Sequence, residues 1–175
     1  LSLIREAEAQ GCKLLVFPEL CITGYTCGDL FNQQLLLSSA WDSLLRIAEE
    51  TAEWNIVSVV GLPVVYQGKL YNCGAVVFGG TILGIVPKAN IPNYTEFYEA
   101  RYFTAYDITG GAKETPLIYE TKEGDSVAVP FGALLFECFH YPGLTFGVEI
   151  CEDLWVGDTP SVLLCREGAS VVCNL

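Results

Sequence analysis

The feature that most constrains this chain is the alternation of short apolar runs with helical patterns. Residues 12–17 and 56–61 are apolar runs of strand length, and residues 33–54 between them carry the apolar spacing of an amphipathic helix. Apolar runs that lack a polar alternation are typical of strands buried on both faces. The pattern therefore predicts an α/β domain with a mixed sheet.

The remaining runs predict further elements of the same kind. A helical pattern covers residues 1–10, a second covers 160–167, and a short one is expected around 96–101. Since no internal repeat or linker is visible, one domain is the simplest account of residues 1–175. Further strands are expected at 64–66, 70–78, 81–86, 134–138, 144–150 and 170–175, and turns at Gln67-Gly68-Lys69, Gly79-Gly80, Gly110-Gly111 and Glu123-Gly124-Asp125.

Charge and hydropathy exclude several classes of protein. Nine Lys and Arg against 21 Asp and Glu give a net charge of −12, which argues against binding to nucleic acid or to anionic membranes. Apolar residues make up 51% of the chain, so it must bury a large core and is not disordered. The longest apolar runs, 57–66 and 127–136, fall well short of the roughly 18 residues that a membrane-spanning helix needs.

Eight cysteines are present, and most of them lie inside strand-like apolar runs, where Cys behaves as a small apolar residue. No C-x-x-C pair occurs and His140 is the single histidine, so no metal site is predicted. We therefore expect reduced thiols and a cytoplasmic location. Because the chain contains no Met, we interpret it as a fragment that is cut at both ends.

Three reactive residues share one local position. Glu19, Lys88 and Cys151 are each the first reactive side chain at the carboxyl end of an apolar run. Open α/β sheets place their functional sites at these strand ends. Any one of them alone is better explained otherwise, because charged residues commonly end strands and a single Cys is more often part of the core. Their shared position makes the three a candidate catalytic set.

The chemistry of such a set is coherent. A free thiol has a pKa of about 8.5 and a glutamate about 4.3, so proton transfer between them costs about 5–6 kcal/mol. Burial would raise the pKa of Glu19, and the ammonium of Lys88 would stabilise the thiolate of Cys151, so both shifts would narrow the gap. The same ammonium could stabilise the oxyanion that forms when a thiolate attacks a carbonyl.

The sequence around these residues resembles a known family. The segments 15–20, 88–94 and 147–155 are similar to the Glu, Lys and Cys motifs of the carbon–nitrogen hydrolase (nitrilase) superfamily. The longer segments 21–31, 92–103 and 149–155 resemble the amino-terminal glutaminase domains of glutamine-dependent NAD synthetases, and the resemblance covers essentially the whole chain. It implies a nitrilase-like α-β-β-α sandwich with mixed sheets, here truncated at both ends.

The resemblance also implies an activity. Glu19 would be the general base, Cys151 the nucleophile that forms a glutamyl thioester, and Lys88 the group that stabilises the oxyanion. In the family, the released ammonia reaches a separate synthetase domain, which uses ATP and Mg²⁺ to amidate deamido-NAD. That domain is absent from these residues, and no cofactor or metal is expected in the hydrolase domain itself. Members of the family assemble into homo-oligomers.

Four further residues are assigned by the same resemblance. Tyr25 and Tyr94 would line the glutamine pocket. Glu152 would hold the amino group of glutamine, and its backbone N–H could join the oxyanion hole. Glu96 resembles a second glutamate near the catalytic set. Judged as isolated residues, the tyrosines could instead pack within loops, and Glu96 and Glu99 could lie on a solvated helix face.

Two other functions stay open on the sequence. The same three residues would serve a nitrilase-type amidase or carbamoylase that acts on another small amide. A domain of this fold could also be a non-catalytic interaction module. The intact Glu19, Lys88 and Cys151 argue against that last reading, because an interaction module has no chemical need for all three.

Overall fold

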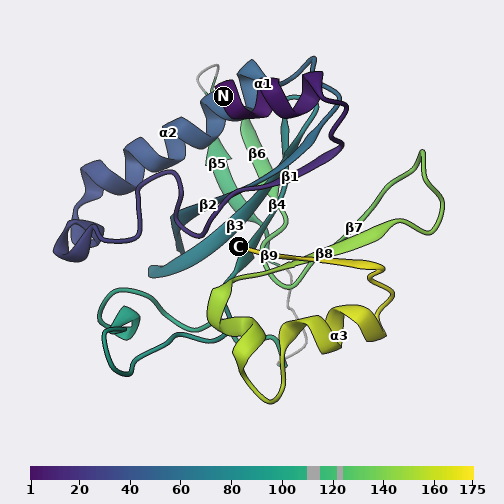
Figure 1. The fold of residues 1–175 in the computed structure, drawn as a ribbon. Helices are drawn as coiled ribbons and strands as arrows, with labels where there is room; N and C mark the ends of the chain where they lie inside the picture. The colour runs from purple at the N-terminus through teal and green to yellow at the C-terminus, as the bar shows by residue number, and fades with distance from the viewer. Residues whose placement is uncertain (110–114, 122–123) are drawn as a thin grey trace.

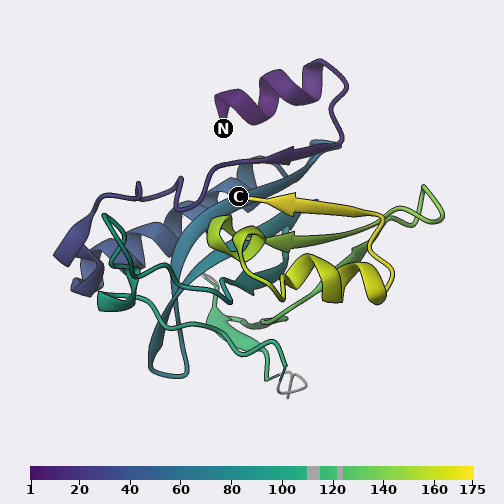
Figure 2. The ribbon, with the colours of Figure 1, turned by 60° about the horizontal axis from the view of Figure 1, so that its bottom comes forward.

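The computed structural model describes residues 1–109, 115–121 and 124–175. Two β-sheets lie face to face, and a helix covers the outer face of each (Figures 1 and 2). Helix α2 (Gln34–Glu50) packs on the first sheet and helix α3 (Pro160–Arg166) packs on the second. The layers confirm the α-β-β-α sandwich that the sequence predicted.

The first sheet has four strands in the order β1-β2-β3-β4. Strands β1 and β2 are parallel, whereas β2, β3 and β4 form consecutive antiparallel hairpins, so the sheet is mixed as expected. The two hairpin turns are those predicted at Gly68 and at Gly79-Gly80. The strands span Leu14–Val16 (β1), Val57–Tyr66 (β2), Lys69–Phe78 (β3) and Thr81–Pro87 (β4).

Strand β2 corrects one prediction. The sequence predicted separate strands at 56–61 and 64–66, but the structure has a single strand that continues through Pro63, which pairs with Asn72 of β3. Strand β1 pairs with β2 only as far as Val59. Beyond that point β2 is an edge strand on its β1 side, and proline is tolerated there because no ladder hydrogen bond is lost.

The second sheet has three strands in the order β7-β8-β9. Strands β7 (Leu135–Glu137) and β8 (Thr145–Glu149) are antiparallel, and β9 (Val171–Asn174) runs parallel to β8. Helix α3 connects the two parallel strands and lies on their outer face (Figure 2). It approaches β8 so closely that a Cβ atom at Gly147 would lie 2.7 Å from a methyl carbon of Leu164.

A small separate hairpin pairs β5 (Leu117–Glu120) with β6 (Ser126–Val129). At its turn the backbone N–H of Gly124 donates to the carbonyl oxygen of Thr121, at 3.0 Å, near the predicted position. Glu123 of that predicted turn, and the predicted turn at Gly110-Gly111, lie outside the described residues.

Two apolar layers hold the sandwich together. One lies between α2 and the first sheet and includes Leu44 and Leu62. The other fills the space between the two sheets, where Val59 and Val76 meet Val148 and the stacked ring of Phe146. All eight cysteines are free, which agrees with the predicted reduced thiols. No helix in the described part of the chain combines the length and apolar character needed to cross a membrane.

The remaining helical segments are short. Helix α1 (Ser2–Ala9) matches the predicted amino-terminal helix, but the helix expected around 96–101 is only a 3₁₀ turn, η2 (Glu99–Arg101). Tyr98, in the middle of that range, has a φ of −142° and a ψ of 41°, which an α-helix cannot contain, so no helix runs from 96 to 101. The sequence did not predict the 3₁₀ helices η1 (Gly28–Asn32) and η3 (Cys151–Trp155).

Candidate active site

The ends of three strands from both sheets bring the predicted catalytic set together. Glu19 follows β1, Lys88 follows β4 and Cys151 follows β8. Nζ of Lys88 lies 2.6 Å from Oε1 of Glu19, although 69 residues separate them in the chain. Cys151 lies close enough to Glu19 and Lys88 for the charges of both to act on the pKa of its thiol. The sequence therefore identified three residues that meet in space.

Glu19 is held by a tight turn against strand β2. Leu20, the next residue, is fully buried and has a φ of 51°, a conformation that is rare for a residue with a side chain. The turn lies directly on Gly61 of β2, where a Cβ atom would stand 2.4 Å from the backbone nitrogen of Leu20 and 2.9 Å from the carbonyl carbon of Glu19. Only glycine leaves room for this approach.

Cys151 lies at the start of η3 and itself adopts a φ of 44°. The buried carboxylate of Asp153 stabilises this turn by accepting a hydrogen bond from the backbone N–H of Ile150 at 3.0 Å. The same carboxylate accepts from the backbone N–H groups of Ala89 and Asn90, at 3.1 and 2.7 Å. Asp153 thus joins the segment before Cys151 to the segment after Lys88.

Lys88 is fully buried and makes contact with two carboxylates. Besides Glu19, its Nζ lies 3.0 Å from both carboxylate oxygens of Glu99, which comes from η2. The phenol of Tyr25 donates to Glu99 at 2.7 Å, and the side-chain amide of Asn72 donates to Glu19, also at 2.7 Å. The resemblance placed Tyr25 in the substrate pocket, and the structure places it against the Glu99 carboxylate.

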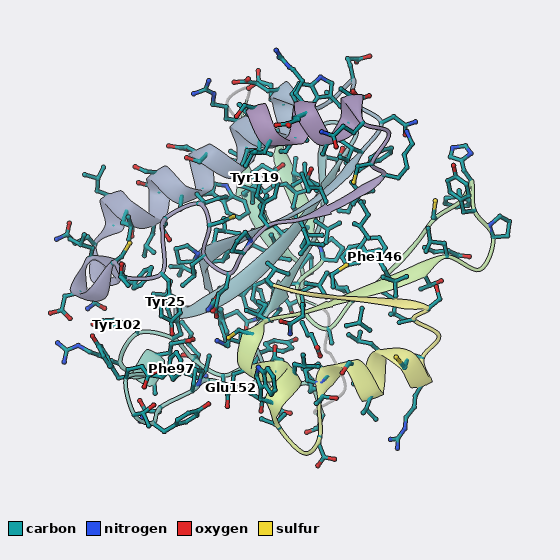
Figure 3. All side chains as sticks on the ribbon, viewed as in Figure 1. Tyr25, Phe97, Tyr102, Tyr119, Phe146 and Glu152 are labelled. Atoms are coloured by element: carbon teal, nitrogen blue, oxygen red, sulfur yellow. The ribbon has the colours of Figure 1, made fainter. Side chains whose placement is uncertain are left out.

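The two other predicted substrate contacts form a pair near this cluster. The phenol of Tyr94 donates to the Glu152 carboxylate at 2.8 Å, and Glu152 directly follows Cys151. Figure 3 shows Glu152, Tyr25 and Phe97 on the same side of the molecule, whereas Tyr119 lies away from them beside α2. Tyr94 and Glu152 are therefore placed where a substrate that reaches Cys151 could contact them.

Glu96 does not take the place that the resemblance suggested for it. Glu99, and not Glu96, makes the ion pair with Lys88. Both glutamates line a cavity of about 160 Å³ together with Tyr25, but Glu96 is exposed at its rim. The reason is the irregular backbone between Thr95, with a φ of 50°, and Tyr98, with a φ of −142° and a ψ of 41°, which turns the chain so that Glu99 is buried.

Burial and charge set the proton affinities of the cluster. Burial raises the pKa of Glu19, and this effect outweighs the lowering by Lys88 and Asn72. Burial by itself lowers the pKa of Lys88, but the carboxylates of Glu19 and Glu99 raise it above its ordinary value. Burial and the hydrogen bond to Glu99 raise the pKa of Tyr25. Lys88 is therefore an ammonium and Tyr25 a neutral donor at neutral pH.

The pKa of Cys151 differs from the value expected from the sequence. The sequence argument expected the Lys88 ammonium to favour the thiolate, but the pKa of Cys151 is raised. Burial is the largest cause, and the carboxylates of Glu19 and Glu99 add to it and outweigh Lys88. Two carboxylates and one ammonium leave the cluster with a negative charge, so the resting form of Cys151 is the thiol. A proton must leave it when it attacks.

A match to a protein family decides how this chain is classified. The family model described as carbon-nitrogen hydrolase matches residues 1–175. The chain belongs to the carbon–nitrogen hydrolase family. The match covers the whole chain, including the three strand ends that carry Glu19, Lys88 and Cys151.

Curated relatives of this carbon–nitrogen hydrolase point to one group of enzymes. A glutamine-dependent NAD(+) synthetase of Mycobacterium tuberculosis is 38% identical over 100% of this chain and 25% of its own length. The enzyme of the same name from Saccharomyces cerevisiae is 29% identical over 99% of this chain and 24% of its own length. The chain thus spans about a quarter of the curated relatives that it matches.

Solved structures agree with the fold. A glutamine-dependent NAD(+) synthetase from Cytophaga hutchinsonii matches 99% of this chain and 26% of its own, with a TM-score of 0.80 and 32% identity. An amidase from Nesterenkonia sp. matches 99% of this chain and 56% of its own, with a TM-score of 0.62 and 18% identity. The amidase supports the fold alone.

Sequence reasoning missed three polar residues of the hydrolase site. Glu99 was weighed only as part of a solvated helix face, and Asn72 and Asp153 were not considered. Asn72 lies within a strand and is fully buried, and a lone polar residue in an apolar run was the available signal. Among the described residues no group of three or more His, Cys, Asp or Glu side chains is arranged to hold a metal ion.

Proposed function

We propose that this chain is the glutaminase domain of a glutamine-dependent NAD synthetase, which hydrolyses glutamine to glutamate and ammonia. The observation that carries the proposal is the meeting of Glu19, Lys88 and Cys151 at three strand ends, where Lys88 pairs with Glu19 and both charges act on the thiol. It supplies a base, a cation and a nucleophile in a chain of the carbon–nitrogen hydrolase family. The names of the relatives supply the substrate, glutamine.

In the first step the thiol of Cys151 attacks the amide carbon of glutamine. A bond forms between Sγ and carbon while the thiol proton moves to the Glu19 carboxylate, whose raised pKa suits it to accept that proton. The electron pair of the carbonyl bond moves to oxygen. Lys88 stabilises this oxyanion, because one of its three N–H donors serves Glu19 and one can serve both Glu99 oxygens, which leaves the third.

The second step releases the products. The oxyanion collapses, the carbon–nitrogen bond breaks, and Glu19 returns its proton to the leaving nitrogen, so ammonia departs and a glutamyl thioester remains on Cys151. Glu19 then takes a proton from a water molecule that attacks the thioester. The carbon–sulfur bond breaks, the thiol regains a proton, and glutamate is released. The proton transfers of the cycle use no group beyond Glu19, Cys151 and water.

Substrate recognition follows from the charges beside the nucleophile. Glutamine carries an α-ammonium group, and the Glu152 carboxylate next to Cys151 is suited to bind it. Tyr94 holds that carboxylate through its phenol, and Tyr25 lines the site on the Glu99 side. The backbone N–H of Glu152 would support the oxyanion beside Lys88.

The wider setting of the domain is part of the same proposal. The ammonia would be used by a separate synthetase domain that binds ATP and Mg²⁺ and amidates deamido-NAD. No residue of this chain is assigned to that chemistry, and the hydrolytic steps above need neither group. The protein would work in the cytoplasm as a homo-oligomer, consistent with its free thiols.

The test is to replace the nucleophile in the intact protein. We expect Cys151→Ala to abolish release of glutamate from glutamine, whereas Cys165→Ala, at an exposed position on α3, keeps it. A trapped adduct on Cys151 with a glutamine-analogue electrophile, identified by mass spectrometry, would support the thioester route. Full glutamine hydrolysis by Cys151→Ala would refute the proposal.

The same preparation separates the alternatives. Faster hydrolysis of simple aliphatic amides or N-carbamoyl compounds than of glutamine would indicate an amidase or carbamoylase. Failure of any amide substrate, together with an unreactive Cys151, would indicate a non-catalytic module.

A further inference from the structure

A buried amide next to the base has a role that the reaction above does not use. Asn72 of β3 is fully buried, and its Nδ2 donates to Oε1 of Glu19 at 2.7 Å. Its other amide atom, Oδ1, is buried and finds no partner among the described residues. A buried polar atom without a partner destabilises the fold, and an apolar side chain would avoid that cost. The hydrogen bond from Nδ2 to Glu19 is therefore the reason for an amide at this buried position.

The orientation of this amide is fixed by the carboxylate. Turned the other way, the amide would direct Oδ1 at the Glu19 oxygen, and two acceptors would repel each other. Oε1 of Glu19 also accepts from Nζ of Lys88 at 2.6 Å. Two strong donors therefore occupy Oε1, and the second oxygen, Oε2, is left for other partners.

We propose that Asn72 is a positioning residue, which together with Lys88 fixes Oε1 of Glu19 so that Oε2 takes the proton of Cys151. The inference rests on the proposed thiol mechanism. Asn72 donates to the Glu19 carboxylate, and it would act on the reaction through that carboxylate.

The charged neighbours of Glu19 show why a neutral donor matters. Lys88 approaches from β4, Glu99 from η2, Cys151 from η3 and Tyr25 from the loop after β1. Lys88 is shared with Glu99, whose carboxylate competes for the same ammonium. The Nδ2 donor of Asn72 is directed at a single carboxylate, that of Glu19. Without it, Glu19 would depend on a cation that a second carboxylate also attracts.

The principal variant is Asn72→Leu in the intact protein, with Ser58→Ala as its matched control. Ser58 lies on the neighbouring strand β2 and is equally buried, and its hydroxyl oxygen is likewise without a partner among the described residues. We expect Asn72→Leu to lower kcat for glutamine by roughly 10-fold to 100-fold, with a change in KM of less than about threefold. Ser58→Ala should leave both values unchanged.

Two readouts separate positioning from a structural role. The hydrogen bond from Asn72 lowers the pKa of Glu19, so its loss should move the acidic limb of the kcat/KM profile to higher pH. The melting temperature should not fall, because Asn72→Leu also removes the unpartnered Oδ1. Asn72→Asp keeps the shape but replaces the donor by an acceptor, and it should move the acidic limb further.

Alkylation of Cys151 by iodoacetamide gives a test that needs no amide substrate. Its rate in the wild type should rise with pH as Glu19 ionises, and this rise should move to higher pH in Asn72→Leu and not in Ser58→Ala. If the wild type does not hydrolyse glutamine, the proposed function fails while this measurement still tests the inference. Unchanged pH profiles in both Asn72 variants would overturn it, as would a loss of kcat that only follows a lower melting temperature.

Discussion

The turns that hold Glu19 and Cys151 at their strand ends differ in which residue adopts the unusual backbone conformation. The first follows the half-buried strand β1 and the second the buried strand β8, and each contains a residue other than glycine with a positive φ, Leu20 at 51° and Cys151 at 44°. At the first turn the unusual conformation falls on a buried neighbour of the reactive residue. At the second it falls on the reactive residue itself.

The supports of the two turns differ as well. The Glu19 turn rests on the backbone of β2, since Gly61 leaves room for it and the carbonyl oxygen of Gly61 accepts from the N–H of Ile22 at 3.1 Å. The Cys151 turn depends on a side chain, the buried carboxylate of Asp153. A turn supported by backbone contact should be sensitive to added volume, and a turn supported by a carboxylate should be sensitive to its loss.

The largest effect is expected for Asp153→Ala. This change leaves the N–H groups of Ile150, Ala89 and Asn90 without their acceptor in a buried region, which should lower the free energy of unfolding by about 3–5 kcal/mol. Glutamine hydrolysis should fall with it. Denaturant unfolding measures the change, and Asp158→Ala, at an exposed position five residues on, is the control. Equal stability of the two variants would contradict the assigned support.

A smaller loss of stability is expected for Gly61→Ala. The new methyl group would stand 2.4 Å from the backbone nitrogen of Leu20, so the Glu19 turn must shift, at a cost of about 1–3 kcal/mol. Because Glu19 moves with the turn, kcat should fall by at least about 100-fold. Gly74→Ala on the paired strand is the control, since its methyl group would meet only side-chain atoms of Val148 and Leu175. A variant with normal kcat would show that the approach to Gly61 does not position the base.

The pH dependence of stability tests the carboxylate that supports the Cys151 turn. Burial raises the pKa of Asp153, so the folded state binds its proton more tightly than the unfolded chain does. Its contribution to the free energy of unfolding therefore increases as pH falls through the folded pKa towards the ordinary value of 3.8. Unfolding of wild type and Asp153→Asn across this window should show the wild type gaining relative stability towards acid. A constant difference would contradict a raised pKa.

The smallest effect is expected for Cys21→Ala. Sγ of Cys21 accepts a weak hydrogen bond from the N–H of Gly61 at 3.3 Å, so the Glu19 turn does have one side-chain support. Because Cys21 is exposed and the bond is weak, its loss should cost less than about 1 kcal/mol. Urea unfolding of this variant beside Asp153→Ala compares the two turns directly. If Cys21→Ala lowered the free energy of unfolding as much as Asp153→Ala does, the two turns would not differ in their dependence on a side chain.

The predicted helices and strands agree best with the structure where apolar runs are bounded by glycine or proline. The hairpins around Gly68 and Gly79-Gly80, the helix α2 and the strands of both sheets were predictable because each signal is local. The continuous strand through Pro63 was not, because proline is acceptable there only on account of where β1 stops pairing. The helix expected around 96–101 did not form because Tyr98 adopts a non-helical conformation, which composition does not reveal.

The candidate site likewise contains residues that the sequence could identify and residues that it could not. Glu19, Lys88 and Cys151 were found because strand ends can be read from the sequence and because their surroundings resemble a family. Glu99 was passed over in favour of Glu96, since the two differ only in how the chain turns after Thr95. The raised pKa of Cys151 was also missed, because it depends on burial and on two carboxylates at distances that no local pattern specifies.

The sequence by itself determined the kinds of element, the acidic and apolar character of the chain, and the reactive side chain at each of three strand ends. These follow from periodicity and from residue type, which are properties of neighbours along the chain. Only the tertiary structure decided that Asn72, Glu99 and Asp153 support those side chains. Their partners lie 53, 11 and 64 residues away in the chain, and only the packing of two sheets brings such groups within hydrogen-bonding distance.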